Sequence, residues 1–367
     1  MHNNAMNRVV FLTALLLAVI LSEHESGANY ADECVTPTNV AGQCVPIPSC
    51  LPILTTLKKH GLNIPATDRQ FIQQSFCGVF GGQNHVCCPK ADITLNSKVV
   101  EQLEKLPCGY FDIPRVANGK EAILFTFPWM ALLKYDDNEN PFKCGGTLIT
   151  ERYVLTAAHC VVGIRYSLIE VRLGEHNISS VEDCQLFGKK LVCAPPVEDI
   201  GIEEIIPHPG YSRFNIMNDI ALIRLNRNVE FKRHIRAICL PITPQLMSTT
   251  PETYFVSGWG YTEKGSTSDV LMYANLPHKD HNACREAYKK IDISDGQLCV
   301  GGNNLQDSCR GDSGGPIAQA ALYNRKLKLV QFGIVSFGVS TCGEKSLPAV
   351  YTNVPHYMQW ITDNIRT

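Results

Sequence analysis

The segment QDSCRGDSGGP, residues 306–316, places a serine between an aspartate and two glycines. A serine hydroxyl is a weak nucleophile unless a neighbouring base removes its proton. Asp312 cannot be that base, because the side chains of adjacent residues in an extended segment point apart. A second acid, Asp307, lies upstream of Ser313 in the same segment. The segment therefore requires a base from elsewhere in the chain and separate roles for its two acids.

Length and composition limit the class of protein. The chain has 367 residues, of which 45% are hydrophobic, so it can bury one sizeable core and carry a smaller module. Its formal net charge of −2 gives no reason to expect binding to nucleic acid or to an anionic membrane. The 16 cysteines predict eight disulfides and an oxidising compartment. Reduced core cysteines or metal sites are the alternative, but the spacing of zinc ligands is absent from the sequence.

The N-terminus carries an apolar run, residues 9–21, that follows a short segment with one positive charge. The run is too short to span a bilayer but suits the core of a signal peptide. Small residues at 26–28 offer a cleavage site. We therefore expect residues 1–28 to be a signal peptide and the product to be secreted, extracellular and without a membrane span.

Six cysteines lie close together in residues 33–88, at positions Cys34, Cys44, Cys50, Cys77, Cys87 and Cys88. A segment this short builds little core and depends on disulfides, each of about 2–4 kcal/mol. The segments ILTTLKK (53–59) and TDRQFIQQSF (67–76) have helical spacing, with Thr67 or Asp68 as the expected N-cap. Residues 89–115 read as a polar linker that is partly helical around VVEQLEKL.

Residues 116–367 read as short strands separated by turns, which is typical of a sandwich or a barrel. The clearest strands are expected at 129–135, 143–150, 153–159, 221–225, 254–260 and 332–338. One segment, residues 356–365, has convincing helical periodicity, with four large apolar side chains on one side.

Two further motifs supply the missing base. TAAHC presents His159 after an apolar strand, and NDIALIRL presents Asp219 just before one. Either residue alone would normally be structural, but together with GDSGGP they give the chain order His, Asp, Ser. In this respect residues 116–367 closely resemble the chymotrypsin-like serine proteases. The resemblance implies an all-β fold of two six-stranded antiparallel β-barrels with a C-terminal helix.

The resemblance also implies a role for each residue of the site. Ser313 would attack the scissile carbonyl, His159 would take and return its proton, and Asp219 would orient the imidazole. The backbone N–H groups of Gly311 and Ser313 would form the oxyanion hole. The resemblance implies no cofactor for catalysis.

The first acid of the opening segment, Asp307, matches the base of the primary specificity pocket in this family. A buried carboxylate there selects Arg or Lys, because a neutral side chain would leave it unpaired. A solvated loop acid is the alternative. Ser336 and Gly338 match the pocket wall, and Ala349 stands where glycine is usual, which favours Arg over Lys. Phe337 stands where these enzymes usually have tryptophan.

The second acid, Asp312, is explained by IPRVANGKEA (113–122), which resembles the activation site of these zymogens. Cleavage between Arg115 and Val116 would create an ammonium that folds inward to pair with Asp312. Breaking such a buried pair costs about 3–5 kcal/mol, which is enough to control the order of the site. The family usually begins Ile-Val-Gly-Gly; VANG keeps the aliphatic first residue and the final glycine.

The six N-terminal cysteines resemble a clip domain of arthropod protease cascades. The disulfides that the resemblance implies within this domain are Cys34–Cys87, Cys44–Cys77 and Cys50–Cys88. Those that it implies elsewhere are Cys108–Cys239, Cys144–Cys160, Cys184–Cys193, Cys284–Cys299 and Cys309–Cys342. The bridge from Cys108 would keep the N-terminal module attached after activation. The expected domains are thus a clip domain at 33–88, a linker with the activation site at 89–115 and a protease domain at 116–367.

A clip domain tethered to such a protease is similar to the insect clip-domain proteases, including easter-type and prophenoloxidase-activating enzymes. RLGEH, CAPPV, ICLPIT, LQDSC and YTNV are shared in particular with one haemolymph protease of the Toll cascade. The resemblance implies a haemolymph zymogen with an upstream activating protease, a downstream protease zymogen as substrate and a serpin inhibitor, serving Toll signalling or melanisation. An inactive homologue acting as a cofactor is the alternative, although all three catalytic residues are present. A general digestive trypsin is another alternative, although it would lack the clip domain.

The loop GEHNISSVED, residues 174–183, resembles the calcium loop of trypsin-like enzymes. Glu175 and Glu182 would supply carboxylates, and Asn177 and Ser180 would supply carbonyl oxygens, which calcium prefers. A solvated acidic loop without an ion is the alternative. Asn177 also begins an Asn-Ile-Ser sequon and is a candidate for glycosylation.

Overall fold

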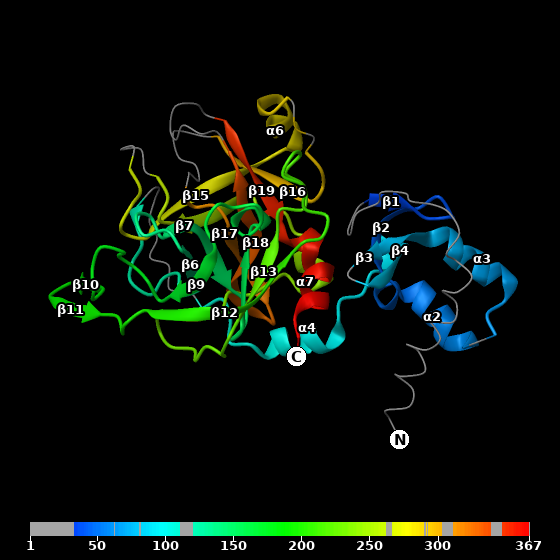
Figure 1. Ribbon diagram of the computed structural model, residues 1–367, viewed down its shortest axis with the longest axis horizontal. Coiled ribbons are helices and arrows are strands. Elements are labelled where there is room, and N and C mark those ends of the chain that lie inside the picture. Colours follow the sequence, from blue (N-terminus) through cyan, green and yellow to red (C-terminus); the bar gives the residue numbers. More distant parts are fainter. Residues whose placement is uncertain are drawn as a thin grey trace, which may run out of the picture. The chain divides into compact units, whose positions relative to one another are not determined.

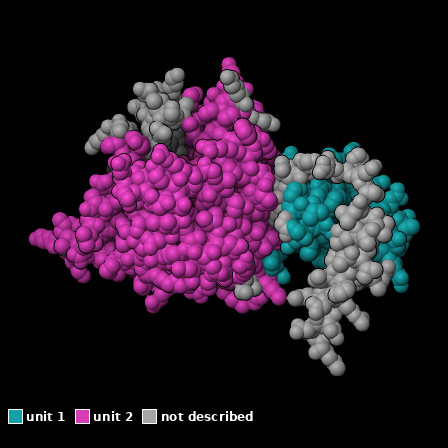
Figure 2. Space-filling model, in the orientation of Figure 1, with its two compact units in different colours: residues 1–97 teal, residues 98–367 magenta. Residues whose placement is uncertain are grey.

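The computed structural model describes residues 33–61, 63–80, 82–110, 120–261, 266–289, 291, 293–302, 311–338 and 347–366. The chain divides into two compact units, residues 1–97 and residues 98–367, which Figures 1 and 2 distinguish.

The first unit is built on a four-stranded antiparallel sheet in the order β1-β2-β4-β3. Its strands are β1 (Glu33–Val35), β2 (Ala41–Pro46), β3 (Phe76–Phe80) and β4 (Gln83–Pro89). The helices α2 (Leu51–His60) and α3 (Ala66–Ser75) and the 3-10 turns η1 (Ile47–Ser49) and η2 (Lys90–Asp92) complete it. The predicted helices are thus present, but the expected N-cap of the second is wrong. Pro65 occupies that position, which leaves Thr67 and Asp68 inside the first turn.

Three disulfides hold this unit together, joining Cys34 to Cys87, Cys44 to Cys77 and Cys50 to Cys88. The apolar cluster at its centre consists of Val45, Cys50, Ile53, Val86 and Cys88. Two of its five buried members are thus disulfide-bonded cysteines, so the cross-links form part of the core. Such a small core needs covalent support to remain folded.

The second unit begins with a closed six-stranded barrel in the order β12-β13-β8-β7-β6-β9. Closure leaves no free edge strand, because the first and last strands pair with each other. Its strands are β6 (Met130–Tyr135), β7 (Phe142–Leu148), β8 (Tyr153–Thr156), β9 (Leu168–Leu173), β12 (Glu198–Pro207) and β13 (Ala221–Leu225). Leu133, Val154 and Ile223 are completely buried in it.

A second set of six strands closes through the pairing of β14 with β15. These strands are β14 (Thr253–Gly258), β15 (Met272–Lys279), β16 (Gln297–Gly301), β17 (Pro316–Tyr323), β18 (Lys326–Phe337) and β19 (Pro348–Asn353). The short strand β5 (Lys120–Glu121) adds to the outside of β15. The prediction of two six-stranded antiparallel barrels is confirmed.

The remaining elements of this unit are α4 (Ser97–Lys105), η3 (Ala158–Cys160), the hairpin of β10 (Cys184–Phe187) and β11 (Lys190–Cys193), α5 (Pro244–Met247), α6 (His281–Ala287), η4 (Val354–Tyr357) and α7 (Met358–Asn364). Helix α7 is the predicted C-terminal helix and buries Trp360 and Ile361. Helix α6 was not predicted from the sequence, although Asp280 caps it by accepting a hydrogen bond from the Asn282 N–H. No helix among the described residues is long and apolar enough to cross a membrane.

Four disulfides lie in the second unit: Cys108–Cys239, Cys144–Cys160, Cys184–Cys193 and Cys284–Cys299. With the three of the first unit, seven of the eight expected pairs are present. The eighth, Cys309–Cys342, lies outside the described residues. The part of the chain that the structure describes contains no free cysteine.

Candidate active site

Asp219 enters the site from the segment just before β13. The preceding residue, Asn218, has a left-handed backbone with φ of 56°. Its side chain donates to the Gly210 carbonyl at 2.9 Å and accepts from the Tyr357 hydroxyl at 2.9 Å. The main-chain carbonyl of Asp219 accepts from the Thr352 hydroxyl at 2.7 Å. The backbone of the acid is therefore fixed by side chains of both η4 and β19.

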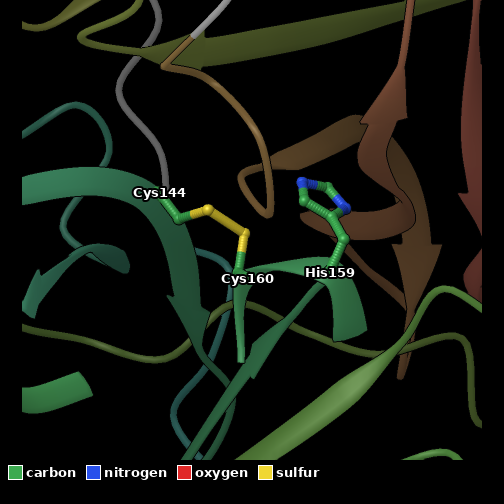
Figure 3. A group of neighbouring side chains, drawn as sticks. All are labelled: Cys144, His159 and Cys160. Atoms are coloured by element: carbon green, nitrogen blue, oxygen red, sulfur yellow. A yellow bond between two sulfur atoms is a disulfide. The ribbon is translucent and has the colours of Figure 1, made fainter. Parts of the chain in front are cut away.

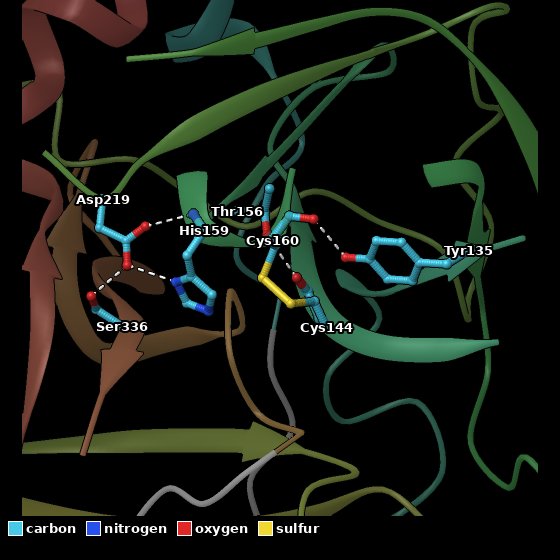
Figure 4. The surroundings of a disulfide bond; sticks show 8 residues. Tyr135, Cys144, Thr156, His159, Cys160, Asp219 and Ser336 are labelled. Atoms are coloured by element: carbon cyan, nitrogen blue, oxygen red, sulfur yellow. Dashed lines mark hydrogen bonds and ion pairs between the residues drawn. A yellow bond between two sulfur atoms is a disulfide. The ribbon is translucent and has the colours of Figure 1, made fainter. Parts of the chain in front are cut away.

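The carboxylate of Asp219 holds His159 by two hydrogen bonds (Figure 4). Oδ1 accepts from the His159 main-chain N–H at 2.9 Å, and Oδ2 lies 2.8 Å from Nδ1 of the imidazole. Because Asp219 is buried, with 1% of its surface exposed, its carboxylate is shielded from water. This contact keeps the ring proton on Nδ1, so that Nε2 can accept a second proton.

The electrostatics of the pair favour the charged acid. Burial alone would raise the pKa of Asp219, but interactions with His159 and Ser336 hold it below its ordinary value. Burial alone would lower the pKa of His159, but Asp219 raises it above its ordinary value. A base whose conjugate acid is stabilised in this way suits proton transfer at neutral pH.

Ser336 makes a contact that its sequence position did not indicate. Its hydroxyl donates to Oδ2 of Asp219 at 2.5 Å (Figure 4), and its place in the wall of a specificity pocket stays a prediction. The residue is buried at the end of β18. Its side chain therefore supports the acid of the site. No local motif indicates this contact, because the two residues are far apart in the sequence.

The turn that carries His159 is braced on the side of the Cys144–Cys160 disulfide (Figures 3 and 4). The Tyr135 hydroxyl donates to the Cys160 carbonyl at 2.8 Å, and the Thr156 hydroxyl donates to the Gly145 carbonyl at 2.8 Å. The two sulfur atoms and the imidazole are close enough for a metal site in principle. The cysteines are bonded to each other, however, and a disulfide lacks the thiolates that bind metals.

Ser313 is brought against this turn by its neighbours. Its carbonyl accepts from the Gly145 N–H at 2.8 Å. A Cβ on the next residue, Gly314, would lie only 2.2 Å from Oγ1 of Thr156 and 3.2 Å from Sγ of Cys160. Only glycine permits this approach. The serine thus lies beside the histidine turn, although among the described residues its hydroxyl forms no hydrogen bond with His159. Such contacts often tighten only when substrate binds.

Asp312 is hydrogen-bonded to the segment that follows β14. Its Oδ1 accepts from the Gly260 N–H at 2.9 Å. A Cβ on Gly258 would lie 2.0 Å from the same oxygen, so the carboxylate occupies space that the glycines of SGWG leave open. The predicted counter-charge for Asp312, the Val116 ammonium, lies outside the described residues, as does Arg115. The predicted donor Gly311 is next to Asp312 and approaches Gly260 closely.

The predicted pocket is only partly described. Asp307 lies outside the described residues. The Cβ of Ala349 would lie 3.2 Å from a Cβ added to Gly338, so the alanine methyl directly faces this glycine. The ring of Phe337 packs edge-on against Tyr288, with 5.4 Å between centroids. The methyl of Ala349 therefore takes up space beside Gly338.

The loop expected to bind calcium is arranged around a carboxylate that the prediction did not include. Asp183 accepts from the N–H groups of His176 and Asn177 and from the Ser180 hydroxyl. Burial and the nearby Asp183 raise the pKa of Glu175 to about 7. The positive charge beside Glu175 is the Arg172 guanidinium at 3.3 Å.

The other expected calcium ligands do not complete a site. The Asn177 carbonyl already accepts from the N–H and hydroxyl of Ser180, and Glu182 is exposed. These four residues therefore do not fit the predicted calcium site. The amide oxygen of Asn177 accepts from the N–H and the hydroxyl of Ser179, and glycosylation of Asn177 stays a prediction.

Comparison with known proteins identifies both parts of the chain. Residues 116–361 match the family model described as trypsin, and residues 34–88 match the one described as the regulatory CLIP domain of proteinases. The chain is 51% identical over 348 residues to serine protease grass of Drosophila melanogaster, covering 92% of each protein. It is 38% identical over 342 residues to phenoloxidase-activating factor 3 of Holotrichia diomphalia, covering 91% of this chain and 94% of the relative.

Among solved structures, the chain is similar to the Drosophila Grass clip serine protease of the Toll pathway. The TM-score is 0.75 at 51% identity, and the match covers 91% of this chain and 97% of the other.

Proposed function

The chain belongs to the trypsin family of serine proteases and carries a clip domain, and we propose that it is a secreted zymogen of a proteolytic cascade in innate immunity. Cleavage between Arg115 and Val116 activates it, and the active enzyme cuts protein substrates after arginine. The observation that carries this proposal is the hydrogen-bonded His159–Asp219 pair lying beside the segment of Ser313.

The catalytic step follows from this geometry. Ser313 attacks the scissile carbonyl while Nε2 of His159 takes its proton, and Asp219 stabilises the imidazolium that forms. The imidazolium then gives its proton to the leaving amine, and water repeats the cycle on the acyl-enzyme. The N–H groups of Gly311 and Ser313 hold the oxyanion, and one such donor lowers the barrier by about 2.7–4 kcal/mol.

The preference for arginine rests on Asp307 and on Ala349. A carboxylate at the base of the pocket excludes neutral side chains, because they would leave its charge unpaired. The Ala349 methyl against Gly338 leaves less room beside the substrate side chain. A planar guanidinium can still bind the carboxylate with two parallel hydrogen bonds, whereas an ammonium cannot. We therefore propose that the enzyme cleaves after arginine in preference to lysine.

Activation depends on the chain between the clip domain and the protease domain. Cys108 is joined to Cys239, and next to it Gly109 pairs with main-chain groups of Ala237 and Leu329 at 2.9 and 3.1 Å. Cys108 and Gly109 are therefore fixed to the protease unit. After cleavage the clip domain stays attached, and the Val116 ammonium pairs with Asp312.

The place in a cascade is supported by the relatives. One relative is a protease of the Toll pathway and another is a phenoloxidase-activating factor, and both resemble this chain over nearly its full length. We propose that it acts in haemolymph between an upstream activating protease and a downstream protease zymogen, and that a serpin inhibits it. The output is Toll signalling or melanisation.

The test is to cleave the purified zymogen and to measure three properties of the same sample. We expect a new N-terminus at Val116, one band without reductant and two bands with it, and hydrolysis of arginyl peptides that appears with cleavage. Arg115→Gln should remain one chain and inactive, and Ser313→Ala should be cleaved but inactive. A fully active single chain, or a product beginning elsewhere than Val116, would contradict the proposal.

A further inference from the structure

The loop that follows β12, residues 208–218, leads directly to Asp219. We name it the Arg213 loop. At its base, Asn218 bonds to the Gly210 carbonyl, and the Ser212 N–H donates to the Met217 carbonyl at 3.2 Å. Nε2 of Gln297 donates to the Ile216 carbonyl at 3.1 Å. The loop is therefore fixed both to itself and to β16 of the second barrel.

The tip of this loop presents Arg213 next to the histidine turn. Nη1 of Arg213 donates to the Gly163 carbonyl at 3.1 Å, and Gly163 follows His159 by four residues. Arg213 is exposed, and no carboxylate pairs with it among the described residues. A guanidinium has five N–H donors in a rigid fork. One donor holds the side chain in place, and the others are free to bind a carboxylate.

The anchor of Arg213 is within reach of a bound substrate. Four residues of extended chain span at most about 14 Å, which limits the distance from His159 to Gly163. The Arg213 charge acts on the site, because it opposes the Asp219-driven rise in the pKa of His159. It likewise opposes the rise in the pKa of Tyr211 that burial and Asp219 cause. A substrate side chain near the scissile bond therefore meets this charge.

We propose that Arg213 is a substrate-binding residue that selects polypeptides with an aspartate or glutamate within three residues of the scissile bond. The inference rests on the proposed function, because it needs an active protease. A carboxylate can bind the free fork of Arg213 by two parallel hydrogen bonds. The neighbouring Phe214 ring is fully exposed and offers apolar surface to the stem of the same side chain or to its neighbour.

Internally quenched peptides with one central arginine test this inference on the cleaved enzyme. Aspartate is placed in turn at each of the three positions before and after the cleaved bond, with asparagine as the neutral reference. We expect kcat/KM to rise about 1.5- to 5-fold for aspartate at one or more positions, as for an ion pair near the surface. The ratio of kcat/KM for the aspartate peptide to that for the asparagine peptide should fall toward one at about 0.5 M salt, because salt screens exposed charges.

Arg213→Gln should abolish this preference, so that the ratio of kcat/KM for the aspartate peptide to that for the asparagine peptide falls to about one, and Arg213→Glu should disfavour aspartate relative to asparagine at the same position. Arg233→Gln is the matched control, because it removes an equally exposed arginine that stacks on Phe125. It should retain the preference for aspartate. Arg213→Lys keeps the charge but loses the fork, and should retain only part of the preference.

The pH profile tests whether the Arg213 charge acts on the catalytic histidine. Asp219 and Arg213 are the charged groups that act on the imidazole, so Arg213→Gln should move the acidic limb of kcat/KM to higher pH. Equal cleavage of aspartate and asparagine peptides at all positions would overturn the inference while leaving the proposed function intact. Failure to cleave any arginyl peptide would overturn both.

Discussion

The two barrels contribute to the active site in different ways. The first barrel supplies His159 and the buried Asp219, which are joined to each other by two hydrogen bonds. The second barrel supplies Ser313 next to Asp312, whose predicted counter-charge is created only by cleavage at Val116. The base is therefore built into the fold, whereas the nucleophile and its oxyanion donors are placed where an ion pair can order them.

In the proposed zymogen, this difference allows the chain to be folded and yet inactive before cleavage. A change at His159 or Asp219, which we call the histidine half of the site, should alter the chemical step and its pH dependence, without affecting cleavage of the precursor. A change at Ser313 or Asp312, which we call the serine half, should alter how much activity appears when the precursor is cleaved.

The largest effect is expected in the histidine half. Asp219→Asn should be cleaved normally at Arg115 but lose about 10⁴-fold in kcat, because the amide favours the wrong tautomer of His159. Asp219 also raises the pKa of His159, so its removal should lower that pKa. The residual activity should therefore extend to lower pH than that of the parent enzyme. A pH profile of kcat/KM on an arginyl peptide measures both effects, and an unchanged acidic limb would contradict this assignment.

Much of this half could be predicted from the sequence, because the motifs around His159 and Asp219 are local. Alternating apolar residues indicated the strands, and the motifs fixed the order in which the catalytic residues occur. The supporting contact from Ser336 could not be predicted in this way. It depends on the direction of a side chain that comes from the other barrel, and sequence spacing does not report that direction.

The acidic loop at residues 174–183 shows the same limit of prediction from sequence. Its oxygen-bearing residues have the spacing of a calcium site, and the sequence reading assigned the carboxylates of Glu175 and Glu182 to the ion. In the structure Asp183 takes the central position and the Arg172 guanidinium supplies the positive charge. Which of several carboxylates turns inward is decided by the hydrogen bonds of the folded loop, and composition alone does not contain that choice.

The next effect concerns the serine half. Asp312→Asn should be cleaved normally between Arg115 and Val116 yet remain largely inactive, because an amide cannot neutralise a buried ammonium. Loss of one partner of a buried pair costs about 3–5 kcal/mol, which corresponds to about 10²- to 5 × 10³-fold in activity. N-terminal sequencing and kcat/KM on the same sample measure the two steps separately. Asp199→Asn, a change on strand β12 of the first barrel, serves as the charge-matched control. Full activity of cleaved Asp312→Asn would show that the serine half does not depend on this ion pair.

The smallest effect is expected at the contact that joins the halves, the hydroxyl of Ser336 on Asp219. Ser336→Ala removes one of several donors to the carboxylate, and a hydrogen bond to a charged group contributes about 1.5–3 kcal/mol. The two bonds from His159 remain, so we expect about a tenfold loss in kcat with little change in KM. Since Ser336 helps to keep the pKa of Asp219 low, the acidic limb of the profile should also change in Ser336→Ala. Ser336→Thr, which retains a hydroxyl, should recover most of the activity. If Ser336→Ala instead raised KM and left kcat unchanged, the residue would act mainly in the pocket wall, as its sequence position first suggested.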